Sequence, residues 1–179
     1  MSSVVSTWGS TPAERAQSFP CDGLLGDPEV VLWRAVDVAA PAEVTFRWLC
    51  QLRVAPYSYD WIDNLGRRSP SEPTPGVERL EIGQRFMTMF ELADLEPERS
   101  LTLRHAGPVW GRLAITYRVA PAGAGRSRLV VKVLARFSRR SPLRIPFRAL
   151  LPAGDLVMMR RQLLNLKGLA ERSASELVG

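Results

Sequence analysis

The sequence has few of the residues that catalysis and metal binding most often use. It contains one histidine, His105, and two cysteines, Cys21 and Cys50, which lie in dissimilar contexts without metal-ligand spacing. A zinc site needs several clustered ligands, and disulfides form in oxidising compartments. We therefore expect two reduced thiols, no bound metal and no cofactor. No serine-hydrolase, phosphate-loop, zinc-protease or dinucleotide motif is present either.

Long apolar runs are also missing. No stretch approaches the roughly 20 apolar residues that a membrane span requires. The first fifteen residues have neither a basic start nor a sustained apolar run, so we expect no secretory signal and a cytoplasmic location. A chain of 179 residues, 46% of them hydrophobic and 23% charged, suits one domain with a well-buried core.

Lysine is scarce, since Lys132 and Lys167 are the only two in the sequence. Arginine therefore supplies nearly all of the positive charge behind the net charge of +6. The arginines are spread along the chain, and no zinc-finger, helix-turn-helix or aromatic RNA-binding motif accompanies them. We expect no nucleic-acid partner. The Arg-rich segment from Arg136 to Arg148 leaves weak association with an anionic membrane open, and the sequence does not set the oligomeric state.

The first part of the sequence predicts an extension, one strand and two short helices. Residues 1–28 are rich in Ser, Gly and Pro and suggest a partly ordered extension. The β-branched residues of 30–38 predict a strand, and the four-residue spacing of Val44, Trp48 and Leu52 predicts a helix after Pro41. Residues 57–66 predict a second short helix, and the prolines of 67–78 predict a surface loop.

Alternating patterns dominate residues 84–137. Residues 84–92, 101–105, 113–119 and 129–137 place apolar side chains on one face and polar side chains on the other. The connections between these segments are short, so we predict an antiparallel meander in which the apolar face, including His105, points inward.

The last long apolar segment predicts an amphipathic helix over 152–173. Leu156, Met159, Leu163, Leu166 and Ala170 form its apolar seam. Residues 138–152 contain three prolines and suggest a loop, whose apolar residues are either buried packing or an adhesive rim. The domain organisation we predict is therefore an extension (1–28), one α+β domain (29–172) and a tail (173–179).

The order of these elements is that of the helix-grip fold, and local residues agree with it. The segment APAEVTFRWL is similar to the start of the first helix in the START-like or SRPBCC superfamily. The segments YSYDWIDNLGRRSP, LEIGQRF and FELADLEPERSLTL resemble a bacterial polyketide cyclase/dehydrase-like branch. The resemblance implies a curved antiparallel sheet wrapped around a long C-terminal helix, with two short helices after the first strand. It also implies a space for an apolar ligand between sheet and helix, but no reaction.

Candidate ligand-binding residues are those expected to border such a cavity. They are Trp61, Phe90, His105, Tyr117, Met159 and Leu163, with Arg160 at the edge of the helix seam as a cation for an anionic head group. The alternatives stay open. Aromatic and Met residues at these spacings also fill ordinary cores, a lone histidine is often structural, and arginines beside an apolar seam often reach solvent.

Three functions remain compatible with the sequence. The first is binding of a small hydrophobic or aromatic molecule, lipid- or polyketide-like, in the cavity. The second is a cyclase or dehydratase-like enzyme that uses His105, Tyr117 and Arg104 as acid-base groups. The third is an interaction or peripheral membrane module that uses the Arg-rich segment. Catalytic residues cannot be assigned from the sequence.

Overall fold

The structure is a computed structural model that describes residues 4–59, 61, 66–87, 89–107, 111–137 and 144–177. Its helices are α1 (Val4–Thr7), α2 (Pro12–Arg15), α3 (Cys21–Leu24), α4 (Ala42–Cys50), the 3-10 turn η1 (Gln51–Arg53) and α6 (Arg144–Glu176). Its strands are β1 (Val30–Val38), β2 (Arg85–Phe86), β3 (Phe90–Glu96), β4 (Ser100–Gly107), β5 (Gly111–Pro121) and β6 (Ser127–Arg136).

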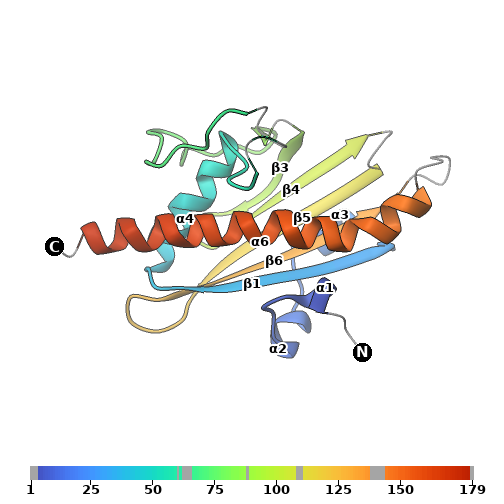
Figure 1. The fold of residues 1–179 in the computed structure, drawn as a ribbon, viewed down its shortest axis with the longest axis horizontal. Coiled ribbons are helices and arrows are strands. Elements are labelled where there is room, and N and C mark those ends of the chain that lie inside the picture. Colours follow the sequence, from blue (N-terminus) through green and yellow to red (C-terminus); the bar gives the residue numbers. More distant parts are fainter. Residues whose placement is uncertain are drawn as a thin grey trace.

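The six strands form one antiparallel sheet in the order β1-β6-β5-β4-β3-β2. Helix α6 runs the length of the molecule across one face of this sheet (Figure 1). The α+β helix-grip architecture is therefore confirmed. The strand predicted over 84–92 is interrupted, because Met87 has a positive φ of 45° and the chain turns between β2 and β3.

The core lies between the inner face of the sheet and α6. Neighbouring strands place inward residues in rows, and one row contains Leu32, Val133, Ile115 and Leu103 in register. These side chains are buried and pack against the seam of α6, in which Leu163 is fully buried. The alternation predicted for the meander is confirmed, because period-two strands must present one apolar face to a single covering helix.

The N-terminal arm, residues 4–28, covers the outer face of the sheet. Phe19, Cys21 and Leu25 are buried there against outward residues such as Trp33 and Leu134. Ion pairs fasten the arm, because Glu14 lies 2.7 Å from Arg128 and Asp22 lies 2.5 Å from Lys132. The arm is thus a second apolar layer. The domain boundaries placed at residues 28 and 172 remain predictions.

Helix α6 is longer than its sequence pattern predicts. It begins at Arg144 rather than Pro152 and continues to Glu176. The loop predicted before it is wrong for residues 144–151, while residues 138–143 lie outside the described part. Pro146 falls in the first turn, where no amide hydrogen is needed. Pro152 lies inside the helix and removes one backbone hydrogen bond, and Figure 1 shows the orange end of α6 turning from the main axis.

The other helix predictions have mixed outcomes. The helix after Pro41 is confirmed as α4, with Val44 and Trp48 buried. The helix predicted over 57–66 is wrong for residues 57–59, which are not helical, whereas residue 61 is helical and residues 60 and 62–65 lie outside the described part. Among the residues that the structure describes, no helix combines the length and apolarity that a bilayer crossing requires.

Candidate functional site

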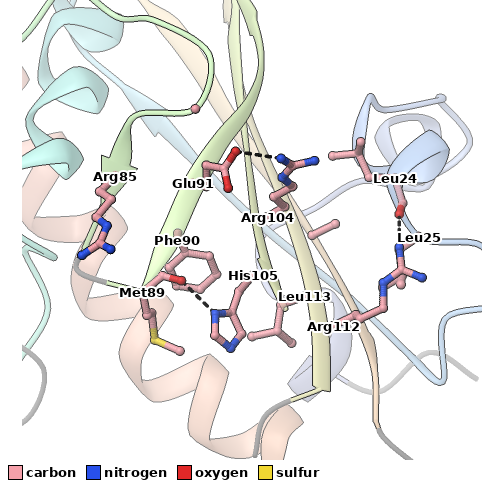
Figure 2. Close-up of a pocket in the computed structure, with 12 residues that line it drawn as sticks. Leu24, Leu25, Arg85, Met89, Phe90, Glu91, Arg104, His105, Arg112 and Leu113 are labelled. Atoms are coloured by element: carbon pink, nitrogen blue, oxygen red, sulfur yellow. Dashed lines mark hydrogen bonds and ion pairs between the residues drawn. The ribbon is translucent and has the colours of Figure 1, made fainter. Parts of the chain in front are cut away.

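A pocket of about 620 Å³ lies at the end of the sheet where β4 ends and β5 begins. We call it the sheet-end pocket. The N-terminal arm, the β2–β3 region, β4 and the start of β5 all contribute to it, as Figure 2 shows. Its lining residues are Leu24, Leu25, Gly83, Arg85, Met89, Phe90, Glu91, Arg104, His105, Arg112, Leu113 and Ala114.

His105 is held in one orientation in this pocket. Its Nδ1 lies 2.8 Å from the Met89 carbonyl oxygen, which can only accept, so Nδ1 carries the hydrogen. In the neutral ring Nε2 is then the acceptor, and it has no hydrogen-bond partner within the described residues. The Phe90 ring packs edge-on against the imidazole, with centroids 5.9 Å apart. The residue is therefore positioned rather than simply exposed at a strand end.

Glycine at position 107 leaves room for this histidine. A Cβ on Gly107 would lie 2.9 Å from His105 Nε2, closer than ordinary Cβ contacts. Any side chain at 107 would therefore push the imidazole aside, and the orientation of His105 depends on the absence of one.

The charged groups of the pocket are mostly cationic. Arg85, Arg104 and Arg112 line it together with a single acid, Glu91. Glu91 pairs with Arg104 at 2.7 Å, and Arg112 donates to the Leu24 carbonyl at 3.0 Å. Figure 2 shows Arg104 and Arg112 beside Leu24, with Phe90 and His105 on the other side of β4 and β5 and Arg85 beyond Phe90. The pocket thus combines apolar walls with an excess of positive charge.

A second group of polar side chains lies inside the core, between the sheet and α6. Arg34 on β1 is 0% exposed and pairs with Asp155 on α6 at 2.7 Å. Tyr117 on β5 donates to Gln162 Oε1 at 2.8 Å, and Gln162 Nε2 donates to the Pro56 carbonyl at 2.6 Å. We call Arg34, Tyr117, Asp155 and Gln162 the buried polar cluster.

Register explains how this cluster assembles. Arg34 and Tyr117 both lie opposite Val131, so they occupy the same inward row on either side of β6, about 10 Å apart by strand spacing. His105 lies opposite Leu113, four residues along β5 from Tyr117, or about 13 Å. The buried polar cluster and the sheet-end pocket are therefore two separate sites.

Burial dominates the electrostatics of the cluster. It raises the pKa of Asp155 from 3.8 to about 6, although the Arg34 charge acts in the opposite direction. Burial also lowers the pKa of Arg34 despite the attraction of Asp155. Loss of water likewise raises the pKa of the Tyr117 hydroxyl well above its usual value, and the negative charge of Asp155 adds to this. For both partners of the ion pair, burial thus makes the charged form less favourable relative to the neutral form than it is in water.

The structure brings together only some of the seven predicted ligand-binding residues. Phe90 and His105 line the sheet-end pocket. Tyr117, Met159 and Leu163 are buried in the core, where Tyr117 contacts Met159 and Gln162. A ligand contact by these residues remains a prediction.

The other two predicted residues lie away from both groups. Trp61 is 75% exposed rather than inward. Arg160 is exposed and its guanidinium lies 5.6 Å from the Trp8 ring centre, because the N-terminal arm covers this edge of α6. The solvent-reaching alternative fits Arg160 better than a place at a cavity edge. The acid-base set of His105, Tyr117 and Arg104 is not assembled either, since Arg104 points to the opposite face of β4 from His105.

Sequence reasoning missed the inward role of Asp155 and two of the pocket arginines, Arg85 and Arg112. In a helix that begins at residue 152, Asp155 lies in the first turn, where an acidic residue suits the helix dipole. The structure begins α6 eleven residues before Asp155, so this explanation does not apply. Arg34 carried a usable signal, since it is in phase with the inward Leu32 and Val36. Arg112 and Leu24 meet only through the path of the N-terminal arm, which no local pattern reveals. The described residues contain no cluster of three or more metal-ligating side chains of the His, Cys, Asp and Glu types.

Neither a family model nor a curated protein matches the sequence. Solved structures do match the fold. The Zhui aromatase/cyclase from Streptomyces sp. R1128 is 20% identical, with a TM-score of 0.52 over 79% of this chain and 93% of its own. The di-domain aromatase/cyclase StfQ of the steffimycin biosynthetic pathway is 10% identical, with a TM-score of 0.51 over 81% of this chain and 51% of its own.

A protein of Thermus thermophilus is similar in shape at 15% identity, with a TM-score of 0.51 over 80% of this chain and 99% of its own. At these identities the likeness establishes fold and not activity. It agrees with the element order, the sheet order and the long covering helix described above. The chain therefore has the helix-grip fold, which it shares with these two aromatase/cyclases.

Proposed function

We propose that this protein binds a small hydrophobic or aromatic molecule in the sheet-end pocket. The observation that supports this most directly is the pocket itself, where the inward residues Phe90, His105 and Leu113 border about 620 Å³ of space. Small-molecule sites typically measure 300–1,000 Å³ and combine apolar walls with a few polar groups. The ligand's apolar body would lie against Phe90 and Met89, with His105 as a hydrogen-bonding group.

A neutral fluorescent probe, N-phenyl-1-naphthylamine, tests this proposal. Its fluorescence rises when it leaves water for an apolar site, so a titration measures its affinity. Met89 lines the pocket and is 40% exposed, so Met89→Trp should fill part of the space without disturbing the core. We expect saturable binding by the wild type and at least tenfold weaker binding by Met89→Trp.

Ile82→Trp provides the matched control, because Ile82 is 61% exposed and does not line the pocket. This variant should bind the probe as the wild type does. Equal binding by all three proteins would locate the probe elsewhere and overturn the proposal, as would an absence of saturable binding. Native mass spectrometry of the purified protein would then identify any ligand that it retains.

A second candidate function is proton transfer on a bound carbonyl compound, as a cyclase or dehydratase-like enzyme would require. The observation that favours it is the fixed His105 tautomer, because His105 lines the pocket and its buried Nε2 is an acceptor without a hydrogen-bond partner in the described residues. In this reaction the Cα–H bond of the ligand breaks, Nε2 takes the proton and the electron pair forms an enolate.

Hydrogen–deuterium exchange of an aromatic 1,3-diketone in D₂O, followed by NMR, tests this candidate. The wild type should accelerate exchange at the carbon between the two carbonyls, and His105→Gln should lose that acceleration while still binding the diketone. Equal exchange rates with both proteins would leave His105 with an orienting role only.

A further inference from the structure

We infer that the sheet-end pocket selects ligands that carry an anionic group, such as a carboxylate or sulfonate, on an aromatic or aliphatic body. This inference rests on the proposed binding function and names the class of ligand. It starts from the distribution of charge in the pocket, where three arginines meet one acidic side chain.

The single acid neutralises only one of these arginines. Glu91 lies 2.7 Å from Arg104, and both side chains are about half exposed. The Arg85 side chain makes no hydrogen bond or ion pair within the described residues, and Arg112 uses only its Nη2 to reach the Leu24 carbonyl. A backbone carbonyl carries no net charge, so Arg112 keeps its full positive charge and spare N–H donors.

The polar and apolar groups of the pocket lie on the two sides of the sheet end. Phe90, Met89 and His105 lie on one side of β4 and β5, and Arg112 and Leu24 lie on the other, while all five line the pocket (Figure 2). A ligand that reaches around the end of the sheet could therefore place its ring against Phe90 and its anionic group near Arg112. Guanidinium groups bind carboxylate and sulfonate oxygens through charge-assisted hydrogen bonds. The pocket contains no second acid among its described lining residues that would oppose an anion.

A matched pair of probes tests the inference. The compound 8-anilinonaphthalene-1-sulfonate has the ring system of N-phenyl-1-naphthylamine plus one sulfonate, so the ratio of the two dissociation constants isolates the anionic group. We expect the sulfonate to bind about tenfold more tightly at low salt, as one or two partly exposed charge pairs allow. Raising the ionic strength should reduce this ratio because mobile ions screen exposed charges.

Variants locate the charge that produces the preference. The preference is the dissociation constant of the neutral probe divided by that of the sulfonate. Arg112→Gln should lower this ratio about fivefold, and Arg85→Gln, on the far side of Phe90, about twofold. Glu91→Gln frees Arg104 and should raise the ratio. Arg99→Gln is the control, because Arg99 is exposed, pairs with Glu96 and lies outside the pocket, so the ratio should not change.

The outcomes separate the inference from the proposed function. If neither probe binds saturably to the wild type, or if Met89→Trp binds both probes as tightly as the wild type does, the binding function itself fails. If the neutral probe binds at the pocket but the sulfonate binds no more tightly, only the anion preference is overturned. A preference that Arg99→Gln reduces as much as Arg112→Gln reflects general surface charge and also overturns it.

Discussion

Replacing Arg34 and Asp155 singly and together should reveal an ion pair that stabilises the protein less than apolar residues would. Arg34 is fully buried and Asp155 nearly so, and the two lie 2.7 Å apart. Moving two charges out of water costs several kcal/mol each, and their attraction often fails to offset that cost. The pKa of Arg34 is lowered and that of Asp155 is raised, and both shifts mean that the cost of burial exceeds the attraction between the charges.

The single variants should differ in their dependence on pH. Asp155→Leu leaves the Arg34 guanidinium buried without a counterion, and arginine does not lose its proton, so we expect a loss of about 3–5 kcal/mol that no titration of Arg34 relieves. Arg34→Met leaves a carboxyl group that can take a proton instead. Its loss of stability relative to the wild type should therefore be smaller at pH 5 than at pH 8, by about 1.4 kcal/mol for each pH unit between pH 6 and the higher pKa of Asp155 in that variant.

The double variant Arg34→Met/Asp155→Leu removes both charges. It should lie within about 1 kcal/mol of the wild type or above it, as apolar replacements of buried ion pairs do. Urea unfolding at several pH values measures all four proteins. A double variant as unstable as Asp155→Leu would show that the pair itself stabilises the fold, and this would refute the reasoning.

Wild-type stability should carry the signature of Asp155 as well. Its pKa is about 6 in the folded protein and 3.8 as an ordinary side chain, so the folded state binds more protons between these values. The contribution of Asp155 is then fully present below pH 3.8 and is lost as the pH rises through 6. Compared with Asp155→Asn, the wild type should lose about 2–3 kcal/mol between pH 4 and pH 7.

Three further predictions concern the core. Tyr117→Phe removes the donor to Gln162 Oε1 inside the core and should cost about 1–3 kcal/mol in urea unfolding, so a change below about 0.5 kcal/mol would contradict the bond's role. Burial raises the pKa of the Cys50 thiol to about 12 and also raises the pKa of the Cys21 thiol, so both should react with a thiol reagent only on unfolding, and fast labelling of the native protein would disagree. Leu163→Ala should cost about 2–5 kcal/mol while leaving probe affinity unchanged, and weaker probe binding without a loss of stability would instead make Leu163 a ligand contact.

Local patterns sufficed for much of the fold. Alternation specified which faces of β4, β5 and β6 point inward, because a sheet covered by one helix must have one apolar face. The bounds of β1 follow from its β-branched residues. The start of α6 could not be predicted, since Pro146 and Pro152 disfavour a helix locally and tertiary packing overrides them.

The candidate site was less accessible to prediction, because its parts lie far apart in the sequence. Strand alternation predicted that Phe90 and His105 point inward, and the resemblance to the helix-grip fold made them candidates for a cavity wall. Leu24 and Arg112 come together only because the N-terminal arm crosses the outer face of the sheet. The partner of Arg34 was equally hidden, because Asp155 is distant in sequence and its inward direction depends on the register of α6.

The most direct test of ligand binding in the sheet-end pocket is an NMR titration of isotope-labelled protein with N-phenyl-1-naphthylamine. Saturable shifts should centre on the amides of Met89, Phe90, His105 and Leu113, which border the pocket from β3, β4 and β5 and the turn before them. Shifts that centre on other parts of the chain, or no saturable shifts at all, would contradict the proposed function.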